Sequence, residues 1–289
     1  MVSIDPKQLS ISKLHSFLLS TIAPRPIALA STVDVNGVPN LSPFSFFNVF
    51  GSNPPIMVFS PARRIRNNTV KHTLQNVEST KEVVINMVDY NMVHQMSLSS
   101  AEYPAGVNEF EKSGLTMLKS DVVKPFRVAE SPVQYECKVN DIIILGNEGG
   151  AGHLIICQVV KFHIKEGLVD NTGAIDPQKL DLVARAGGNY YTRAKEGFFQ
   201  IEKPLSVLGI GVDNFPDHVK NSMVLTGNDL GMLGNVERLP SPKKVKAFIE
   251  DLTERYPNIK TATRHEKHKL AQNYLSFGDV ESAWKILLS

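Results

Sequence analysis

The sequence predicts an α+β protein that is mainly β, in which a barrel or sandwich of short strands carries peripheral helices and a C-terminal helical extension. Runs rich in β-branched residues dominate residues 27–169, which favours strands. Few helical patterns separate these runs, which argues against a doubly wound parallel sheet. After about residue 197 the composition changes to a loop rich in Gly, Asn and Pro and then to helical periodicity. We therefore expect one domain over residues 1–197 and an extension over residues 198–289.

Charge and hydropathy exclude several classes of partner. The net charge of the 289 residues is only +2, which gives no global electrostatic support for nucleic-acid binding. No apolar run approaches the roughly 20 residues of a membrane span. The first residues lack a basic head followed by an apolar block, so no signal peptide is expected. These features predict a cytoplasmic protein that binds neither nucleic acid nor membrane.

The elements of the first domain follow from local patterns. Residues 1–20 predict a lead-in with one short helix. Tyr135, Cys137 and Val139 alternate with polar neighbours, which is the period of a half-buried antiparallel strand. Strands are expected at residues 27–32, 56–60, 82–88, 133–139 and 153–160. Helices are expected at residues 68–77, 91–99 and 107–112, the last with a C-cap at Gly114.

Two glycine-containing segments predict turns between strands. Asn36-Gly37 tolerates the positive φ angles of a tight hairpin turn. The glycine-rich residues 147–152 lie between two strand-like runs, and no helix follows them, so we expect a hairpin loop and not a phosphate loop. A third segment, Gly209-Ile210-Gly211, fails the dinucleotide-binding pattern because Asn214 stands where the third glycine belongs.

The extension predicts a loop followed by helices. Residues 208–212 are strand-like, and residues 214–240 form a loop. Ser241 and Pro242 are typical of the N-cap and first position of a helix. Residues 263–277 and 279–288 predict a helical hairpin, which we expect to serve as a docking or dimer element. The helix that begins at Pro242 has its apolar face at Val245, Phe248, Ile249, Leu252 and Tyr256.

Two segments of the first domain carry the chemistry. Residues 42–48 mix hydroxyl and backbone donors with aromatic rings, which suits a flat heterocycle with a polar edge. Residues 61–71 hold four positive charges and no acid, and lead from a strand into a helix that Asn68 or Thr69 could cap. A helix N-terminus, a hydroxyl and guanidinium groups make a phosphate cradle. A solvated loop with an ordinary N-cap is the alternative, but the two segments together predict a flavin nucleotide site.

Other polar residues have a functional and a structural interpretation. His153 opens a strand beside the glycine-rich loop, where it is either a structural histidine or a weak catalytic candidate that contacts a cofactor. Residues 185–191 combine an Arg, two Gly and two Tyr, which are either a turn with surface aromatics or a flavin contact. Cys137 and Cys157 lie far apart and predict two buried reduced thiols and no metal site. Since the serine hydrolase and zinc protease motifs are absent, any catalysis is expected to come from a cofactor.

In this order and spacing, several segments resemble the flavin reductase-like family with the FMN-binding split β-barrel fold, which includes flavoredoxin-type proteins. The resemblance covers roughly residues 15–195. It depends on PRPIALAST, NLSPFSFFN, NPPIMVFS before RRIRNNT, VVINMV, GVNEFEKSGL, SPVQYEC and RAGGNYY. It implies a Greek-key type split barrel, bound FMN, a homodimer with flavin near the interface, and NADH or NADPH as electron donor.

The resemblance also implies site residues. Ser42, Pro43, Phe44, Ser45 and Asn48 match the segment that lines the flavin ring and ribityl chain, and the phosphate side matches Ser60, Arg66, Asn68 and Thr69. Arg25, His153, Arg185 and Tyr190 match positions near the cofactor. The phosphate segment departs from the family's usual Lys-Asp-Thr, since Asn67-Asn68-Thr69 stands there and leaves helix capping to Asn.

These features predict an FMN-dependent NAD(P)H oxidoreductase that passes hydride from nicotinamide to flavin. Two alternatives stay open. One is an FMN-containing electron carrier coupled to a redox protein partner, and the other is a flavin-binding protein without catalysis.

Overall fold

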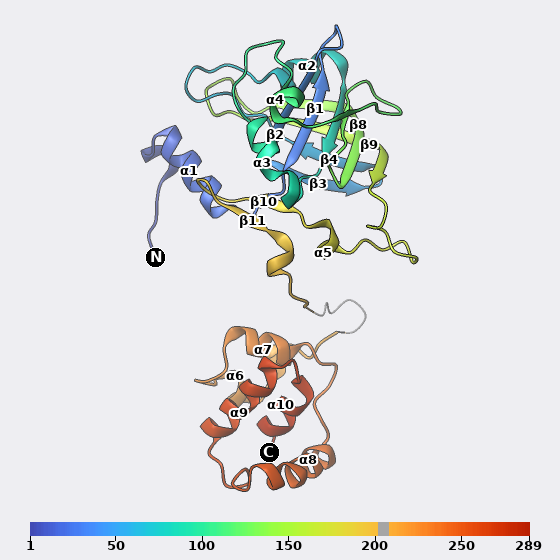
Figure 1. Ribbon diagram of the computed structural model, residues 1–289. Coiled ribbons are helices and arrows are strands. Elements are labelled where there is room, and N and C mark those ends of the chain that lie inside the picture. The colour runs from blue at the N-terminus through green and yellow to red at the C-terminus, as the bar shows by residue number, and fades with distance from the viewer. Residues whose placement is uncertain (202–207) are drawn as a thin grey trace. The chain divides into compact units, whose positions relative to one another are not determined.

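The structure, a computed structural model, describes residues 1–201 and 208–289 and divides into two compact units (Figure 1). The first unit spans Met1–Phe199 and the second spans Gln200–Ser289. Each has its own hydrophobic core, since the buried clusters of the first unit contain no residue of the second. The two units are therefore described separately.

The first unit is built on a seven-stranded antiparallel sheet with the strand order β2-β1-β5-β8-β9-β4-β3. The predicted strands are present, and the last two are longer than predicted because both continue into a long hairpin. The strands of this sheet are β1 (Ala28–Val33), β2 (Pro39–Phe44), β3 (Phe47–Ser52), β4 (Pro55–Phe59), β5 (Glu82–Asn86), β8 (Val133–Ile144) and β9 (His153–Ile164). Two small pairs lie apart from it, namely β6 (Met117–Leu118) with β7 (Arg127–Val128) and β10 (Val183–Arg185) with β11 (Tyr191–Arg193).

Both predicted turns are confirmed as connections between antiparallel strands. Gly37, with a φ of +85°, lies in the turn from β1 to β2, where a side chain would be strained. The Asp34 carboxylate accepts hydrogen bonds from the backbone N–H groups of Asn36 and Val38 and closes that turn. The loop over residues 145–152 joins β8 to β9. A hairpin loop is therefore the correct interpretation of the glycine-rich segment.

Helices cover both faces of the sheet. Leu74 and Val77 of α2 (His72–Thr80) belong to the core cluster that includes Phe59 and Ile155 of the sheet. Met96 of α3 (Val93–Leu98) and Phe110 of α4 (Glu109–Ser113) pack into a second cluster. By contrast, α1 (Ile11–Thr21) buries no residue and lies at the side of the unit near β10 and β11 (Figure 1). The remaining short elements are η1 (Pro6–Gln8), η2 (Tyr90–Met92), α5 (Pro177–Leu180) and η3 (Ala194–Gly197).

The prediction of a helix from residue 68 was wrong at its start, and so was the prediction that Asn68 or Thr69 caps it. Helix α2 begins at His72, and its N-cap Lys71 makes no side-chain capping bond. Asn68 adopts a left-handed conformation with a φ of +54°, which an Asn tolerates in a turn. Its side-chain amide is occupied elsewhere, since it donates to the Asn147 carbonyl oxygen at 3.0 Å. The chain therefore turns once more before the helix starts.

The second unit is a helical bundle around a buried tryptophan. Trp284 is fully buried, its Nε1–H donates to the Leu233 carbonyl oxygen at 2.9 Å, and its ring meets that of Phe215 edge-on. The predicted cap of Ser241 and the two following helices are confirmed. The helices are η4 (Val212–Asn214), α6 (Asp217–Lys220), α7 (Gly227–Gly234), α8 (Pro242–Arg255), α9 (Arg264–Ser276) and α10 (Val280–Leu287).

The strand predicted at residues 208–212 was wrong, and the loop predicted over residues 214–240 contains the helices α6 and α7. Ile210 donates its backbone N–H to the Val236 carbonyl oxygen, but the segment forms no strand and passes into η4. Ile210 and Val212 pack partly against the helical core. Their apolar, β-branched character therefore reflects burial among helices, which short apolar runs do not distinguish from strands.

The observed architecture is α+β with a large antiparallel sheet. The strand pairings end at β2 and β3, so barrel closure and Greek-key type stay predictions. Among the helices of residues 1–201 and 208–289, none is both long and apolar enough to cross a bilayer.

Candidate functional site

The basic segment after β4 lines a surface cavity of about 500 Å³. Two guanidinium groups, an imidazole, two side-chain amides and a hydroxyl group line this space, and no carboxylate of residues 1–201 or 208–289 does so. The lining residues are Arg63, Arg64, Asn68, Thr69, Val70, His72 and Gln75. The predicted phosphate-side residues Asn68 and Thr69 are thus brought together with two arginines and the start of α2.

The two arginines are held in place by the turn that follows them. Arg63 donates from Nε to the Asn68 side-chain oxygen at 2.6 Å and from a terminal nitrogen to the Asn68 carbonyl oxygen at 2.7 Å. Arg64 donates to the Thr69 hydroxyl at 2.9 Å and to the Val70 carbonyl oxygen at 2.6 Å. Asn68 and Thr69 therefore position the arginines, in addition to any contact of their own with a ligand.

Unused donors at this cavity suit an anion. Because Lys71 makes no side-chain capping bond, the first N–H groups of α2 lack a capping side chain, and the helix dipole favours negative charge there. Burial, and to a lesser extent the nearby Arg64, lowers the pKa of Lys71. Within the described part of the chain, the buried Nε of Arg64 makes no hydrogen bond, although Glu102 Oε1 lies 3.2 Å from it. A phosphate group, which is dianionic and rich in acceptors, fits these donors.

Arg66 lies outside the lining of this cavity. Its side chain is 75% exposed and pairs with Glu102, at 2.5 Å between Arg66 Nη2 and Glu102 Oε2. An exposed side chain on a flexible stem adds less to a bound anion than a positioned one. The resemblance named Arg66 for the phosphate side, whereas Arg63 and Arg64, which it did not name, line this cavity.

The structure joins several predicted ring-side residues through Arg25. Its buried guanidinium contacts the Ser45 hydroxyl at 3.3 Å and the carbonyl oxygens of Leu19 and Ala186 at 2.5 and 3.3 Å. The backbones of Arg25 and Arg185 exchange two hydrogen bonds. Burial and the neighbouring Arg185 lower the pKa of Arg25. Arg25 therefore ties α1, the β2–β3 turn and residues 185–186 together.

The segment after Arg185 presents aromatic rings to solvent. Tyr190 is 77% exposed, while the Arg185 guanidinium lies over the Tyr191 ring at 4.6 Å. Arg185 also donates to the carbonyl oxygens of Gly188 and Tyr190. Arg185 and Tyr190 are thus neighbours, and the exposed Tyr190 ring is free to stack against a partner group.

The predicted flavin segment divides into exposed and buried residues. Ser42 and Pro43 are half-buried on the edge strand β2, and Asn48 on β3 is exposed. The Phe44 side chain is buried and packs against Phe59, so any ligand contact at Phe44 comes from its backbone. This burial explains why an aromatic residue stands there irrespective of a ligand.

Ser60 and His153 form a buried pair beside the basic segment. The Ser60 hydroxyl accepts a hydrogen bond from the His153 backbone N–H at 3.1 Å, and His153 Nδ1 lies 3.1 Å from the Pro61 carbonyl oxygen. Only 2% of His153 is exposed. These contacts fasten the start of β9 to the end of β4, which is the structural interpretation of His153.

Gly187 marks a close approach between α1 and the segment after Arg185. A Cβ atom at Gly187 would lie 2.4 Å from the Ser20 hydroxyl oxygen and 3.0 Å from the Ser20 Cα. We predict that Gly187→Ala displaces α1, whereas Gly197→Ala, which has open space around it, leaves the helix in place. Hydrogen exchange of the α1 amides measures the difference, and equal protection in both variants would contradict the close packing.

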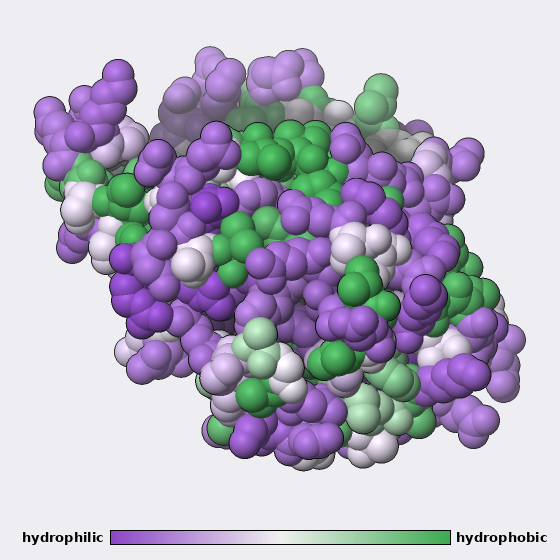
Figure 2. Space-filling model, turned by 90° about the horizontal axis from the view of Figure 1, so that it is seen from above, coloured by the Kyte–Doolittle hydropathy of each residue, from purple (hydrophilic) through white to green (hydrophobic). Residues whose placement is uncertain are grey.

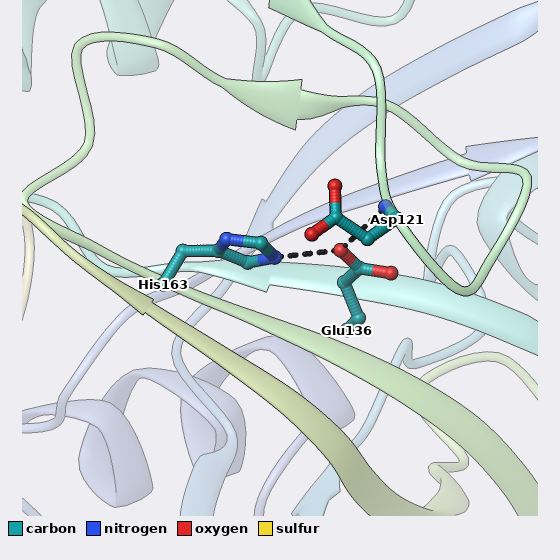
Figure 3. A group of neighbouring side chains, drawn as sticks. All are labelled: Asp121, Glu136 and His163. Carbon is teal, nitrogen blue, oxygen red and sulfur yellow. Dashed lines mark hydrogen bonds and ion pairs between the residues drawn. The ribbon is translucent and has the colours of Figure 1, made fainter.

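The structure also assembles three side chains that the sequence did not single out (Figure 3). Potential metal-ligating atoms of Asp121, Glu136 and His163 lie within 4.8 Å of one another. Glu136 is fully buried, accepts from the backbone N–H groups of Asp121, Val122 and Val123 at 2.7–3.1 Å, and lies 2.6 Å from His163 Nε2. Its oxygens are therefore already bonded, and the cluster fastens a loop to β8. These residues come from segments that are far apart in the sequence, so no local motif predicts the cluster.

The protein-family model described as the flavin reductase like domain matches residues 20–184 of this chain. An uncharacterized protein from Halalkalibacterium halodurans is 35% identical over 205 residues, which are 70% of this chain and 97% of that relative. An uncharacterized protein from Aquifex aeolicus is 36% identical over 181 residues, which are 63% of this chain and 90% of that relative. The second unit lies beyond the residues that the family model matches.

Solved structures agree with these relatives. Nitrilotriacetate monooxygenase component B from Bacillus cereus is 30% identical, with a TM-score of 0.65 over 70% of this chain and 98% of its own. A split barrel domain protein of flavin reductase type from Shewanella frigidimarina is 27% identical, with a TM-score of 0.60 over 71% of this chain and 99% of its own. The flavoredoxin of Desulfovibrio vulgaris, at 18% identity and a TM-score of 0.54 over 71% of this chain and 98% of its own, shares the fold. Together with the matched family model, these similarities establish that the chain belongs to the flavin reductase-like family.

Proposed function

We propose that this protein is an FMN-dependent oxidoreductase that takes electrons from NADH or NADPH. The cavity lined by Arg63 and Arg64 carries this proposal, because it gathers positive charge and unused donors within a domain of the flavin reductase-like family. Arg63, Arg64, Thr69 and the first N–H groups of α2 would hold the phosphate.

On the ring side, residues 42–48 and Arg185 with Tyr190 would surround the flavin. Bound FMN would supply the chemistry by accepting a hydride from nicotinamide. The chain's part is to hold donor and acceptor near van der Waals contact and to keep the polar edge of the ring hydrogen-bonded. Arg25 supports this role by fixing Ser45 and the segment that begins at Arg185 relative to each other.

Exposed apolar residues support a homodimer, which the site of this family implies. Val49 and Phe50 on β3 and Ile144 and Leu145 at the end of β8 are 58–69% exposed. Helix α1 also buries none of its residues. Apolar patches interrupt the hydrophilic surface on the face that Figure 2 shows. A second copy that covers such surfaces would complete the site near the flavin.

The visible spectrum tests the proposed function directly. The purified protein is mixed with FMN and then reduced anaerobically with NADH or NADPH. We expect flavin to bind and its absorption bands to bleach with one of the two donors. Bound flavin that neither nicotinamide bleaches would favour an electron carrier or a non-catalytic flavoprotein. A protein that binds no flavin would contradict the proposal as a whole.

Arg64→Ala is expected to weaken FMN binding by roughly 10- to 100-fold, because one charge-assisted contact contributes about 1.5–3 kcal/mol. The loss should shrink as salt rises, since the contact is ionic. Lys124→Ala removes the same charge from an exposed site away from the cavity and should change little. Flavin fluorescence titration measures these affinities.

Arg66→Ala should have a smaller effect than Arg64→Ala, because Arg66 is exposed and outside the cavity lining. A larger loss in Arg66→Ala than in Arg64→Ala would place the phosphate elsewhere.

The second unit supports the electron-carrier alternative, because a unit with its own core offers a surface for a protein partner. Deletion from residue 241 would not be a clean test, because it removes Trp284 while leaving Leu233 and Phe215 behind. Removing residues 200–289 is the better test. A carrier should then lose coupling to its partner, and a self-sufficient reductase should keep nicotinamide oxidation.

A further inference from the structure

Glu102 is the only acidic side chain paired with the basic segment in residues 1–201 and 208–289. It lies on the loop between α3 and α4, far in sequence from residues 63–71. Its carboxylate oxygens contact Arg66 Nη2 at 2.5 Å and Arg64 Nε at 3.2 Å. One carboxylate therefore bridges an arginine that lines the cavity and one that lies outside it.

The contact with Arg64 is electrostatic and poorly aligned. The Arg64 Nε lies close to Glu102 Oε1 but has no partner with hydrogen-bond geometry. A buried guanidinium N–H that lacks an aligned acceptor gains from one that reaches it directly. Glu102 neutralises the charge of Arg64 without forming a hydrogen bond with its Nε–H group. This N–H group can therefore still donate to a bound anion.

Positive charge surrounds Glu102. Burial alone would raise its pKa, but Arg66, Arg64 and Lys71 outweigh this and lower the pKa below the usual value. The Glu102 side chain is 43% exposed, so its carboxylate can turn from Arg64 toward solvent. A phosphate bound at the cavity would repel this carboxylate, since both are negative and share Arg64.

We infer that Glu102 is a specificity-determining residue that competes with the flavin phosphate for Arg64 and sets the anion affinity of the cavity. This inference rests on the proposed function and identifies Glu102 as the group that the flavin phosphate displaces from Arg64. Removal of the Glu102 charge should therefore strengthen the binding of a doubly charged anion more than that of a singly charged one, because the repulsion grows with the charge of the anion.

The test compares Glu102→Gln with Glu78→Gln in the full-length protein. Glu78 is exposed on α2, pairs with no charged side chain that the structure describes, and gives the same change in net charge. We expect Glu102→Gln to bind FMN about three- to tenfold more tightly at low ionic strength, with the gain shrinking at high salt. Glu78→Gln should bind like the unmodified protein. An unchanged or weaker affinity in Glu102→Gln would overturn the inference, and a weaker one would make Glu102 a residue that positions Arg64.

Titration with inorganic phosphate separates this inference from the proposed function. If the unmodified protein binds no FMN, the proposed function fails, but phosphate binding to the same three proteins still tests Glu102. Stronger phosphate binding by Glu102→Gln alone supports competition at Arg64. Equal phosphate binding by all three proteins overturns it. Chloride, which carries a single charge, should show a smaller gain than phosphate in the same comparison.

Discussion

Replacing Glu136 with Ala is expected to destabilise the first unit by about 3–5 kcal/mol, the range for breaking a buried charged network. Three backbone N–H groups and His163 would lose their acceptor at once, and water does not reach this fully buried position. The loop at residues 121–123 should detach from β8. Guanidinium titration followed by circular dichroism measures the loss, and hydrogen exchange assigns it to β8.

Asp141→Asn is the matched control, because Asp141 is an exposed carboxylate on the same strand. It should change stability by less than about 0.5 kcal/mol. If Glu136→Ala proved as mild as this control, the buried carboxylate would not fasten the loop.

The same network should make stability depend on pH. Burial alone raises the pKa of Glu136, but hydrogen bonds from Asp121, Val122 and His163 outweigh it and lower the pKa. A lowered folded-state pKa means that the contribution is complete above the ordinary glutamate pKa of about 4.3. It is then lost as the pH falls through the lower folded-state value. Glu136→Gln should remove this part of the acid sensitivity.

Trp284→Ala is expected to unfold the second unit, with a cost of about 3–5 kcal/mol for the lost packing and the cavity left behind. The indole is fully buried, so the loss also leaves the Leu233 carbonyl oxygen without its donor. Since the first unit has separate cores, its unfolding transition and its FMN affinity should stay unchanged. Calorimetry and flavin titration on the same sample measure the two effects.

Phe277→Ala serves as the control for Trp284→Ala. Phe277 is 83% exposed in the same unit, so its removal should leave the second unit folded. If Trp284→Ala also abolished flavin binding, the second unit would have to contribute to the flavin site.

The sequence predicted several strands of the sheet because their signals are local. Alternation at Tyr135, Cys137 and Val139 and the Asn36-Gly37 turn are local signals, and both lie in antiparallel pairs of the structure. The start of α2 was missed for a physical reason. Asn68 favoured a cap in the sequence, but the fold uses it in a left-handed turn that holds Arg63.

The candidate site was only partly predictable. The basic stretch at residues 61–71 was recognisable as one charged run, whereas the contribution of Glu102 depends on a contact across 36 residues. Likewise, Glu136 looked like an ordinary polar residue of an alternating strand, and its three backbone partners come from a separate loop. Long-range polar contacts of this kind leave no periodic signature in a single sequence.

The self-contained packing of Trp284, Leu233 and Phe215 has a consequence for engineering. The Halalkalibacterium halodurans protein aligns with this chain along 97% of its own length, and the alignment covers only 70% of this chain. A chimera in which residues 200–289 follow such a short relative should therefore fold as two modules. Any partner binding that the second module provides should be transferred to the chimera with it. Comparing the chimera with the short relative alone would then reveal the role of that module.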